Sequence, residues 1–141
     1  GNKQSSKYRD IAAILDEHKD LLRWSKDEVV LDAGCGPGDF THNALLPRIP
    51  DDACKYMVGV DISPTTKEYG FKNFPHPKLF FETLDLSTKN LDVLRNDPRL
   101  KDGFEKIFFF YALLWIPDIK ALAQIFFFSV MPFDGFKDLK F

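Results

Sequence analysis

The chain has 141 residues, of which 45% are hydrophobic, and its 19 basic and 21 acidic side chains leave a formal net charge of −2. This composition excludes a disordered or collagen-like chain and predicts one globular domain, residues 1–141. The near-neutral balance argues against nucleic acid as a partner, because binding to a phosphate backbone needs a broad basic surface.

The first elements predict a helix, a buried strand and a second helix. Apolar residues recur at helical spacing over Ser6–Trp24 and predict an amphipathic helix. The apolar, β-branched run Val29–Leu31 stops before a glycine-rich turn and predicts a buried parallel strand. A helix is expected over Asp39–Leu46, closed by Pro47.

The same alternation continues along the chain. Tyr56–Val60 predicts a second strand, and Ser63 and Pro64 predict the N-cap and first residue of a helix that ends near Asn73. The expected later elements are strands over Leu79–Leu84 and Lys106–Tyr111, a short helix over Leu91–Arg95, a helix from Pro117, and a fifth strand over Phe136–Phe141. Strands alternating with helices predict an α/β fold, a Rossmann-like, doubly wound and mostly parallel sheet with flanking helices.

In such a sheet a ligand binds at the carboxyl ends of the strands, so residues that follow each strand are candidates for a site. After the first strand comes a D-x-G-x-G-x-G turn, whose glycines allow a sharp bend and close approach of a ligand. Its candidate binding residues are Asp32, Gly34, Cys35, Gly36 and Gly38. Asp39 stands where the dinucleotide-binding G-x-G-x-x-G motif requires a third glycine, which disfavours an oxidoreductase.

The other strand ends carry two acidic residues and an aromatic run. Asp61 is placed to accept hydrogen bonds from ribose hydroxyls, and Ile62 to pack on a nucleoside base. Asp85, with Leu86, follows the third strand and could accept from an exocyclic amine. The backbone of Phe109 and Phe110 is expected to line the floor of the pocket. Each feature also has a structural interpretation, because a glycine turn and an aspartate that caps a helix are common without a ligand.

Together the D-x-G-x-G-x-G turn and the acids after strands two and three resemble a class I S-adenosylmethionine-dependent methyltransferase. Residues 24–41 and 104–118 resemble more specifically the juvenile hormone acid O-methyltransferases of arthropods. The family segment F-S-F-Y-x-L-H-W-I corresponds to F-F-F-Y-A-L-L-W-I over residues 108–116. Phe109 replaces a small polar residue there, and Leu114 replaces a histidine.

The resemblance implies S-adenosylmethionine as cofactor and the carboxylate of a small apolar acid as methyl acceptor. It assigns Trp115 to orientation of the acceptor, together with Lys7 or Gln4 at the position of a family glutamine. Trp115 can equally be a core aromatic, and Lys7 a solvated charge. No general base is needed, because a carboxylate is already ionised at neutral pH.

The sequence departs from the family over residues 129–135, which correspond only loosely to the family's L-L-K-P-G-G turn, with an extra bulky residue and no cation, and the family's carboxy-terminal strands are not matched. This departure predicts an exposed sheet edge beside a phenylalanine-rich surface, including Phe108–Phe110 and Phe126–Phe128, and hence a homodimer. The alternative function is a non-catalytic protein of the same fold that binds the cofactor or an apolar ligand, or acts through protein interactions.

The remaining features concern cell location and metals. Two cysteines, Cys35 and Cys54, are too few for a disulfide framework, and no Cys/His cluster has the spacing of a zinc site. The longest uncharged runs, 107–117 and 121–133, are shorter than the roughly 20 apolar residues that span a bilayer. The polar residues 1–10 contain no secretory signal. We therefore expect a cytoplasmic protein without a metal site or a membrane span.

Overall fold

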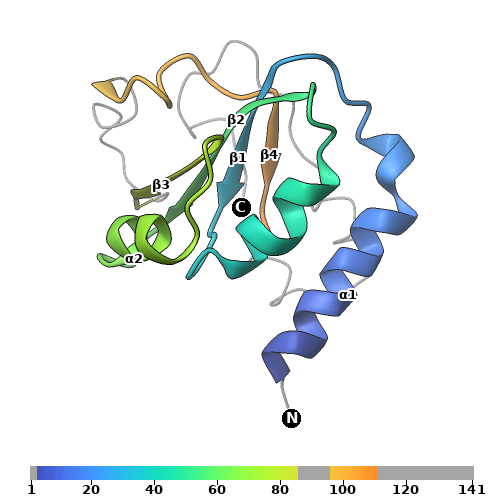
Figure 1. Cartoon of the computed structure of the whole chain (residues 1–141), viewed down its shortest axis with the longest axis horizontal. Coiled ribbons are helices and arrows are strands. Elements are labelled where there is room, and N and C mark those ends of the chain that lie inside the picture. Colours follow the sequence, from blue (N-terminus) through green and yellow to red (C-terminus); the bar gives the residue numbers. More distant parts are fainter. Residues whose placement is uncertain (1–2, 86–95, 111–141) are drawn as a thin grey trace.

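A computed structural model of the chain describes residues 3–85 and 96–110, with side chains from residue 8 onward. Four strands form one parallel sheet in the order β3-β2-β1-β4 (Figure 1). They are β1 (Glu28–Ala33), β2 (Cys54–Asp61), β3 (Leu79–Thr83) and β4 (Lys106–Phe108). The expected Rossmann-like parallel sheet is confirmed for this part of the chain.

The two faces of the sheet bury different side chains, because neighbouring residues of a strand point to opposite sides. Val30, Met57 and Phe81 face α1 (Lys3–Glu17), the helical segment 39–48 and α2 (Thr66–Asn73), which lie on one side of the sheet (Figure 1). Leu31 and Val58 face the other side, where residues of the 96–105 segment such as Leu100 and Phe104 pack.

The first helix is shorter than the sequence predicts. It ends at Glu17 rather than near Trp24, and a 3-10 turn over Lys19–Leu21 follows it. His18, with a φ of −113° and a ψ of 18°, has already left the helical conformation, and Arg23 has a φ of 47°, a left-handed conformation that a right-handed helix cannot contain. The chain therefore bends away before Trp24, and this bend directs it into β1.

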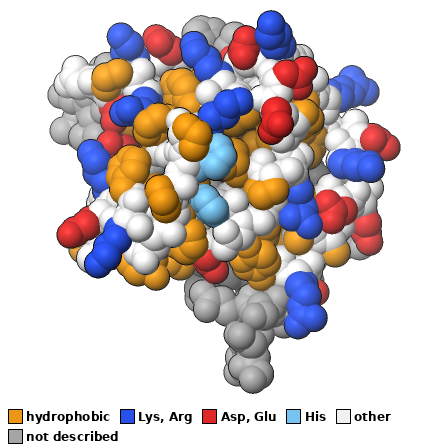
Figure 2. All heavy atoms as spheres, viewed as in Figure 1, with side chains coloured by type: hydrophobic (Ala, Val, Ile, Leu, Met, Phe, Trp, Pro, Cys, Tyr) orange, Lys and Arg blue, Asp and Glu red, His pale blue; other side chains and the backbone are white. Residues whose placement is uncertain are grey.

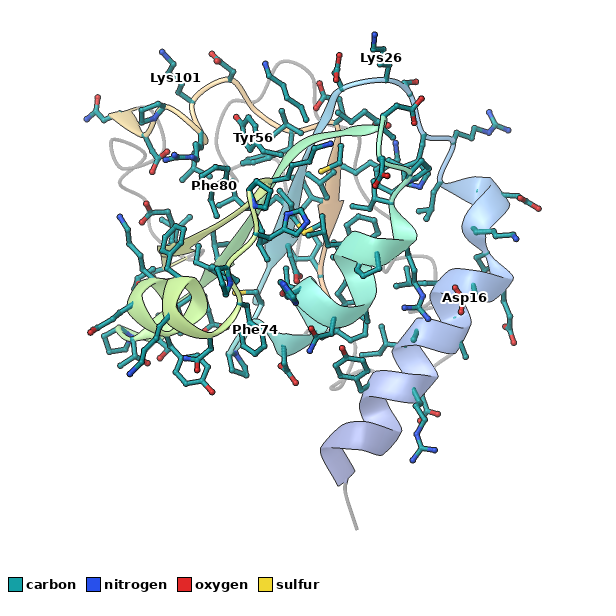
Figure 3. All side chains as sticks on the ribbon, viewed as in Figure 1. Asp16, Lys26, Tyr56, Phe74, Phe80 and Lys101 are labelled. Carbon is teal, nitrogen blue, oxygen red and sulfur yellow. The ribbon has the colours of Figure 1, made fainter. Side chains whose placement is uncertain are left out.

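The segment after the glycine turn is helical but irregular. Residues 39–40 begin a helix, Thr41–Leu45 form a π-helical turn, and Leu46–Arg48 form a 3-10 turn. The prediction that Pro47 closes the helix was wrong, because Pro47 lies inside the first turn of the 3-10 helix, where its missing N–H costs nothing. Asp16 lies on α1 (Figure 3) and pairs with Arg48 at 2.9 Å, which joins the two helical elements.

The start of α2 also differs from the prediction. Thr65, and not Ser63, precedes the first helical residue, and Pro64 lies in the preceding turn. Ser63 has another role, because its backbone N–H donates to the carboxylate of Asp61 at 3.0 Å.

Two strands end earlier than predicted: β3 stops at Thr83 and β4 at Phe108.

A buried ion pair joins the amino ends of β1 and β4. Lys106 Nζ donates to Glu28 Oε1, and each side chain is only 6% exposed. The second carboxylate oxygen of Glu28 accepts from the backbone N–H of Ser25 at 2.6 Å. Lys106 Nζ also lies 4.4 Å from the ring centroid of Trp24, a cation–π contact. These contacts lie at the opposite end of β1 from the glycine turn.

The expected phenylalanine-rich surface is wrong for Phe108–Phe110. The three residues are 0%, 8% and 3% exposed, because the chain carries alternate rings into the two cores. The other members of that surface, Phe126–Phe128, lie outside the described residues, as do the elements expected over 91–95, from Pro117 and over 136–141.

Among the residues that the structure describes, none of the helices has the length and apolar character of a membrane span.

Candidate functional site

The glycine turn that follows β1 adopts a conformation that only glycine enters freely. Gly34, Gly36 and Gly38 have φ values of 78°, 58° and 97°. The backbone N–H groups of Gly34 and Cys35 both donate to the carbonyl oxygen of Val60 in β2, at 2.8 and 2.9 Å. The turn is therefore both sharply bent and attached to the carboxyl end of the neighbouring strand.

Gly38 is also required by packing. A Cβ at this position would lie 2.7 Å from Cε1 of Phe81, closer than real Cβ contacts. The ring of Phe81 similarly lies against Gly59 and Gly70, where an added Cβ would come within 3.3 and 2.4 Å of it. Phe74 packs beside this ring and lies between α2 and the 39–48 segment (Figure 3). Phe81 thus holds the glycine turn against α2.

Asp61 joins the ends of β1 and β2. Its Oδ2 accepts from the backbone N–H of Gly36 at 2.9 Å, and its Oδ1 accepts from the N–H of Ser63 at 3.0 Å. Asp61 therefore has a structural role, because it holds the backbone of the glycine turn and of the residues that follow β2. Asp61 is partly exposed, and each carboxylate oxygen can accept more than one hydrogen bond, so a ligand hydroxyl can still be bound there.

Asp32 is almost completely buried, with 2% of its surface exposed. The hydroxyl of Thr41 donates to its Oδ2 at 2.6 Å, whereas its Oδ1 is buried and has no hydrogen-bond partner among the described residues. Burial raises the pKa of Asp32 from 3.8 to about 7, the Thr41 hydrogen bond lowers it, and the nearby charge of Asp61 raises it. A cation that bound Oδ1 would satisfy this oxygen and favour the ionised carboxylate.

Ile62 and Asp85 project at neighbouring strand ends. Ile62 is 67% exposed, one of the most exposed large apolar side chains of the described part. Asp85 is exposed just beyond β3, and the N–H of the preceding Leu84 donates to the backbone oxygen of Asp61 at 2.8 Å. This bond brings Asp85 to the same edge of the sheet as Asp61. Leu86 lies outside the described residues.

Phe109 and Phe110 follow β4 at this edge, but their rings point away from solvent. Phe109 packs into the core with Leu100 and Phe104, and the ring of Phe110 meets Phe40 edge-on at a centroid distance of 5.0 Å. Phe40 in turn contacts the ring of Tyr8 at 4.8 Å. Only the backbone of Phe109 and Phe110 remains to line a site, because both side chains are buried.

The three residues assigned to the acceptor are placed only in part. Gln4 and Lys7 lie on α1, whose amino-terminal end is on the same side of the molecule as the carboxyl ends of β1 and β4 (Figure 1). The Tyr8 hydroxyl donates to the backbone oxygen of Asp39 at 3.2 Å, which attaches α1 to the residue after the glycine turn. Trp115 lies outside the described residues.

The two cysteines and the possible metal ligands indicate no further reactive site in the described part of the chain. Cys35 and Cys54 are free and buried, and burial raises the pKa of both thiols, so neither is a ready thiolate nucleophile. No group of three or more His, Cys, Asp or Glu side chains within residues 3–85 and 96–110 is arranged to hold a metal ion. Figure 2 shows basic and acidic side chains mixed over the helical face, with apolar side chains between them.

Sequence reasoning missed Thr41. The residue lies three positions after Gly38, where the pattern predicts ordinary helix, and no local signal shows that its hydroxyl reaches Asp32.

A comparison of sequences identifies a curated relative. The chain is 34% identical over 120 residues to the juvenile hormone acid O-methyltransferase of Bombyx mori. The alignment covers 84% of this chain and 40% of that protein. The chain thus spans about two fifths of the length of this relative, and the resemblance noted in the sequence is confirmed. No family model matches the chain.

Solved structures show the same fold. An S-adenosylmethionine-dependent methyltransferase from Mesorhizobium loti matches with a TM-score of 0.50 and 23% identity, over 82% of this chain and 48% of that one. The CurJ carbon methyltransferase matches with a TM-score of 0.52 and 18% identity, over 77% and 28%. At these identities the likeness concerns the fold, which is the Rossmann-like fold of methyltransferases.

Proposed function

We propose that this chain, which resembles juvenile hormone acid O-methyltransferase in sequence and has a methyltransferase fold, binds S-adenosylmethionine and takes part in methyl transfer to a carboxylate. The observation that carries the proposal is the joint geometry of β1 and β2. The turn after β1 has three glycines with positive φ, and one of them, Gly36, donates its backbone N–H to Asp61 at the end of β2. Asp32, near the end of β1, has a buried carboxylate oxygen without a partner among the described residues.

The described residues fit the cofactor. Asp61 is suited to the ribose hydroxyls, exposed Ile62 to a face of the base, and Asp85 to its exocyclic amine. Asp32 offers its free oxygen to the ammonium group. The remaining residues of the proposed site are Gly34, Cys35, Gly36 and Gly38 of the turn, Leu86, and the backbone of Phe109 and Phe110.

The proposed reaction needs positioning rather than proton transfer. When bound, S-adenosylmethionine supplies a methyl group on a positively charged sulfur. The acceptor carboxylate is ionised at neutral pH, so the protein must align it with the methyl carbon and exclude water. We assign Trp115, with Lys7 or Gln4 on α1, to hold the acceptor, because the start of α1 and the glycine turn lie at the same end of the sheet.

The acceptor class is taken from the relative in Bombyx mori. Its name specifies a juvenile hormone acid, which supports a small apolar carboxylic acid as the acceptor for this chain. As parts of the same proposal, residues 1–141 form one domain, and the protein is cytoplasmic, a location with which the free thiols Cys35 and Cys54 agree.

The test is isothermal titration calorimetry of the chain with S-adenosylhomocysteine, the demethylated product. We expect saturable binding in the micromolar range. Asp61→Asn should weaken it about tenfold or more, because charge-assisted hydrogen bonds contribute roughly 1.5–3 kcal/mol. Asp52→Asn is the matched control, because Asp52 is exposed in the turn just before β2, at the opposite end of the strand from Asp61.

The outcomes separate cleanly when circular dichroism is recorded on the same samples. If the folded wild-type chain does not bind S-adenosylhomocysteine, the proposed function is refuted. If it binds but both asparagine variants bind equally well, the site is placed wrongly.

A further inference from the structure

The contact between Asp32 and Thr41 is unusual in its burial. Asp32 lies in β1 between Gly59 of β2 and Phe108 of β4, and Thr41 is on the helical segment that covers this face of the sheet. Their side chains are hydrogen-bonded at 2.6 Å, and the two residues are 2% and 0% exposed. Water therefore does not compete for this bond.

The position of Thr41 follows from the irregular helix. Thr41 begins the π-helical turn, and the next residue, His42, donates its backbone N–H to the carbonyl oxygen of Gly38 at 3.0 Å. A π-helical turn is rare and occurs mostly as a single turn, frequently at functional sites. In this chain it places a hydroxyl under the last residues of β1.

The hydrogen bond from Thr41 satisfies only one of the two oxygens of the Asp32 carboxylate. Oδ2 is satisfied by Thr41, whereas Oδ1 is buried and has no partner in the described part. The titratable groups that face Asp32 are Asp61 at the end of β2 and the buried thiol of Cys35 in the glycine turn, and neither supplies positive charge. The pKa of Asp32 is accordingly raised to about 7, mainly by burial, so that near neutral pH the carboxyl is partly protonated.

On the basis of the proposed function, we propose that Thr41 is a positioning residue for Asp32, and that cofactor binding releases a proton from Asp32. Thr41 holds one oxygen in place, and the other oxygen accepts a hydrogen bond from the ammonium group of the ligand. The O–H bond of the carboxyl breaks, its proton goes to solvent, and the carboxylate remains paired with the cation. Affinity for the cofactor consequently depends on pH through Asp32.

Calorimetry with S-adenosylhomocysteine tests this linkage over the range from about pH 5.5 to 7.5, in two buffers that differ in ionisation enthalpy. We expect Kd to rise about tenfold for each pH unit below about 7, with nearly one proton released per ligand at the acidic end. Thr41→Val should weaken binding about tenfold near neutral pH and move the profile to higher pH, because a lost hydrogen bond disfavours the ionised form. Thr41→Ser should restore the wild-type profile.

Thr66→Val is the matched control. Thr66 is also a buried threonine, 3% exposed, and its hydroxyl has no partner among the described residues. Loss of this hydroxyl should change neither Kd nor its pH profile. A second measurement needs no ligand: carbon-13 NMR of the Asp32 carboxyl should show a midpoint near pH 7 that moves upward in Thr41→Val.

Binding that is independent of pH, or identical profiles for Thr41→Val and Thr66→Val, would overturn the inference while leaving the proposed function intact. An Asp32 midpoint near its ordinary value would also overturn it, even if neither variant folds well enough for calorimetry. Absence of ligand binding by the folded wild-type chain would refute both proposals.

Discussion

Asp32 is the residue at which burial and charge are in conflict. A carboxylate that is 2% exposed, accepts one hydrogen bond and leaves its second oxygen without a partner in the described part is costly to ionise. A purely structural position would favour an amide or an apolar side chain. The presence of an acid here agrees with the proposed use of Asp32 as a ligand group.

The conflict predicts a specific dependence of stability on pH. The pKa of Asp32 is about 7 in the folded chain and near 3.8 in the unfolded one, so between these values only the folded chain keeps the proton. The free energy of unfolding should therefore fall as pH rises from about 4 to 7, by roughly 4 kcal/mol from this group. Asp32→Asn, which carries no charge, should abolish this part of the decrease.

Urea denaturation at several pH values measures the effect, with Asp52→Asn as the control for an exposed aspartate. Parallel stability curves for the wild type and Asp32→Asn would show that Asp32 titrates normally.

At the scale of elements, the two ends of the sheet have different tasks. The carboxyl ends of β1 and β2 carry glycines with positive φ and the acids Asp32 and Asp61, whereas the amino ends of β1 and β4 are joined by the buried pair of Glu28 and Lys106. Tight packing also supports the carboxyl ends of the strands, where the ring of Phe81 leaves no room for side chains at Gly38 and Gly70. Substitutions in the buried pair at the amino ends should therefore change stability without changing binding.

The buried pair provides the second prediction of stability. Lys106→Met should lower the free energy of unfolding by about 3 kcal/mol or more, because it leaves the charge of Glu28 buried without its cation. Adding Glu28→Gln should recover much of the loss, since the double variant contains no unpaired charge. Affinity for S-adenosylhomocysteine should stay unchanged in both, because the pair lies far along β1 from the glycine turn.

Lys67→Met is the matched control for this experiment. Lys67 pairs with Glu82 at 3.0 Å, but its side chain is 56% exposed, so its removal should cost less than about 1 kcal/mol. Equal losses for Lys106→Met and Lys67→Met in urea denaturation would contradict the argument from burial.

At the scale of the whole molecule, the edges of the sheet bear on the oligomeric state. In the sheet that the described residues form, β3 and β4 are the outermost strands (Figure 1). The homodimer expected from the sequence stays a prediction, and its support from Phe108–Phe110 is lost because these rings are buried. What remains is pairing along a strand edge.

Light scattering coupled to size-exclusion chromatography decides the oligomeric state. We expect a mass of about twice 16.3 kDa at micromolar concentration, falling toward that of a monomer on dilution. A single monomeric peak across the concentration range would contradict the dimer.

Much of the fold could be predicted because its signals are local. Short apolar runs, β-branched in β1 and rich in phenylalanine in β4, predicted all four described strands, and the glycine turn was correctly placed at the carboxyl end of β1. Helix boundaries were less accurate, because the apolar spacing continues through Leu21 and Leu22 although α1 ends at Glu17, and nothing in the sequence pattern marks the π-helical turn that begins at Thr41. The roles of Asp61 and Asp32 as ligand groups stay predictions.

The amino-acid sequence by itself determined the alternation of strands and helices, the glycine turn, and the order of the acids that follow the strands. These features depend on backbone preferences and on the spacing of apolar residues, which act between near neighbours. Only the tertiary structure decided that Thr41 bonds to Asp32, that Asp61 bonds to Gly36, and that Phe81 requires Gly70. Each of these contacts joins residues that different elements bring together, and their energies depend on burial, which the folded chain alone creates.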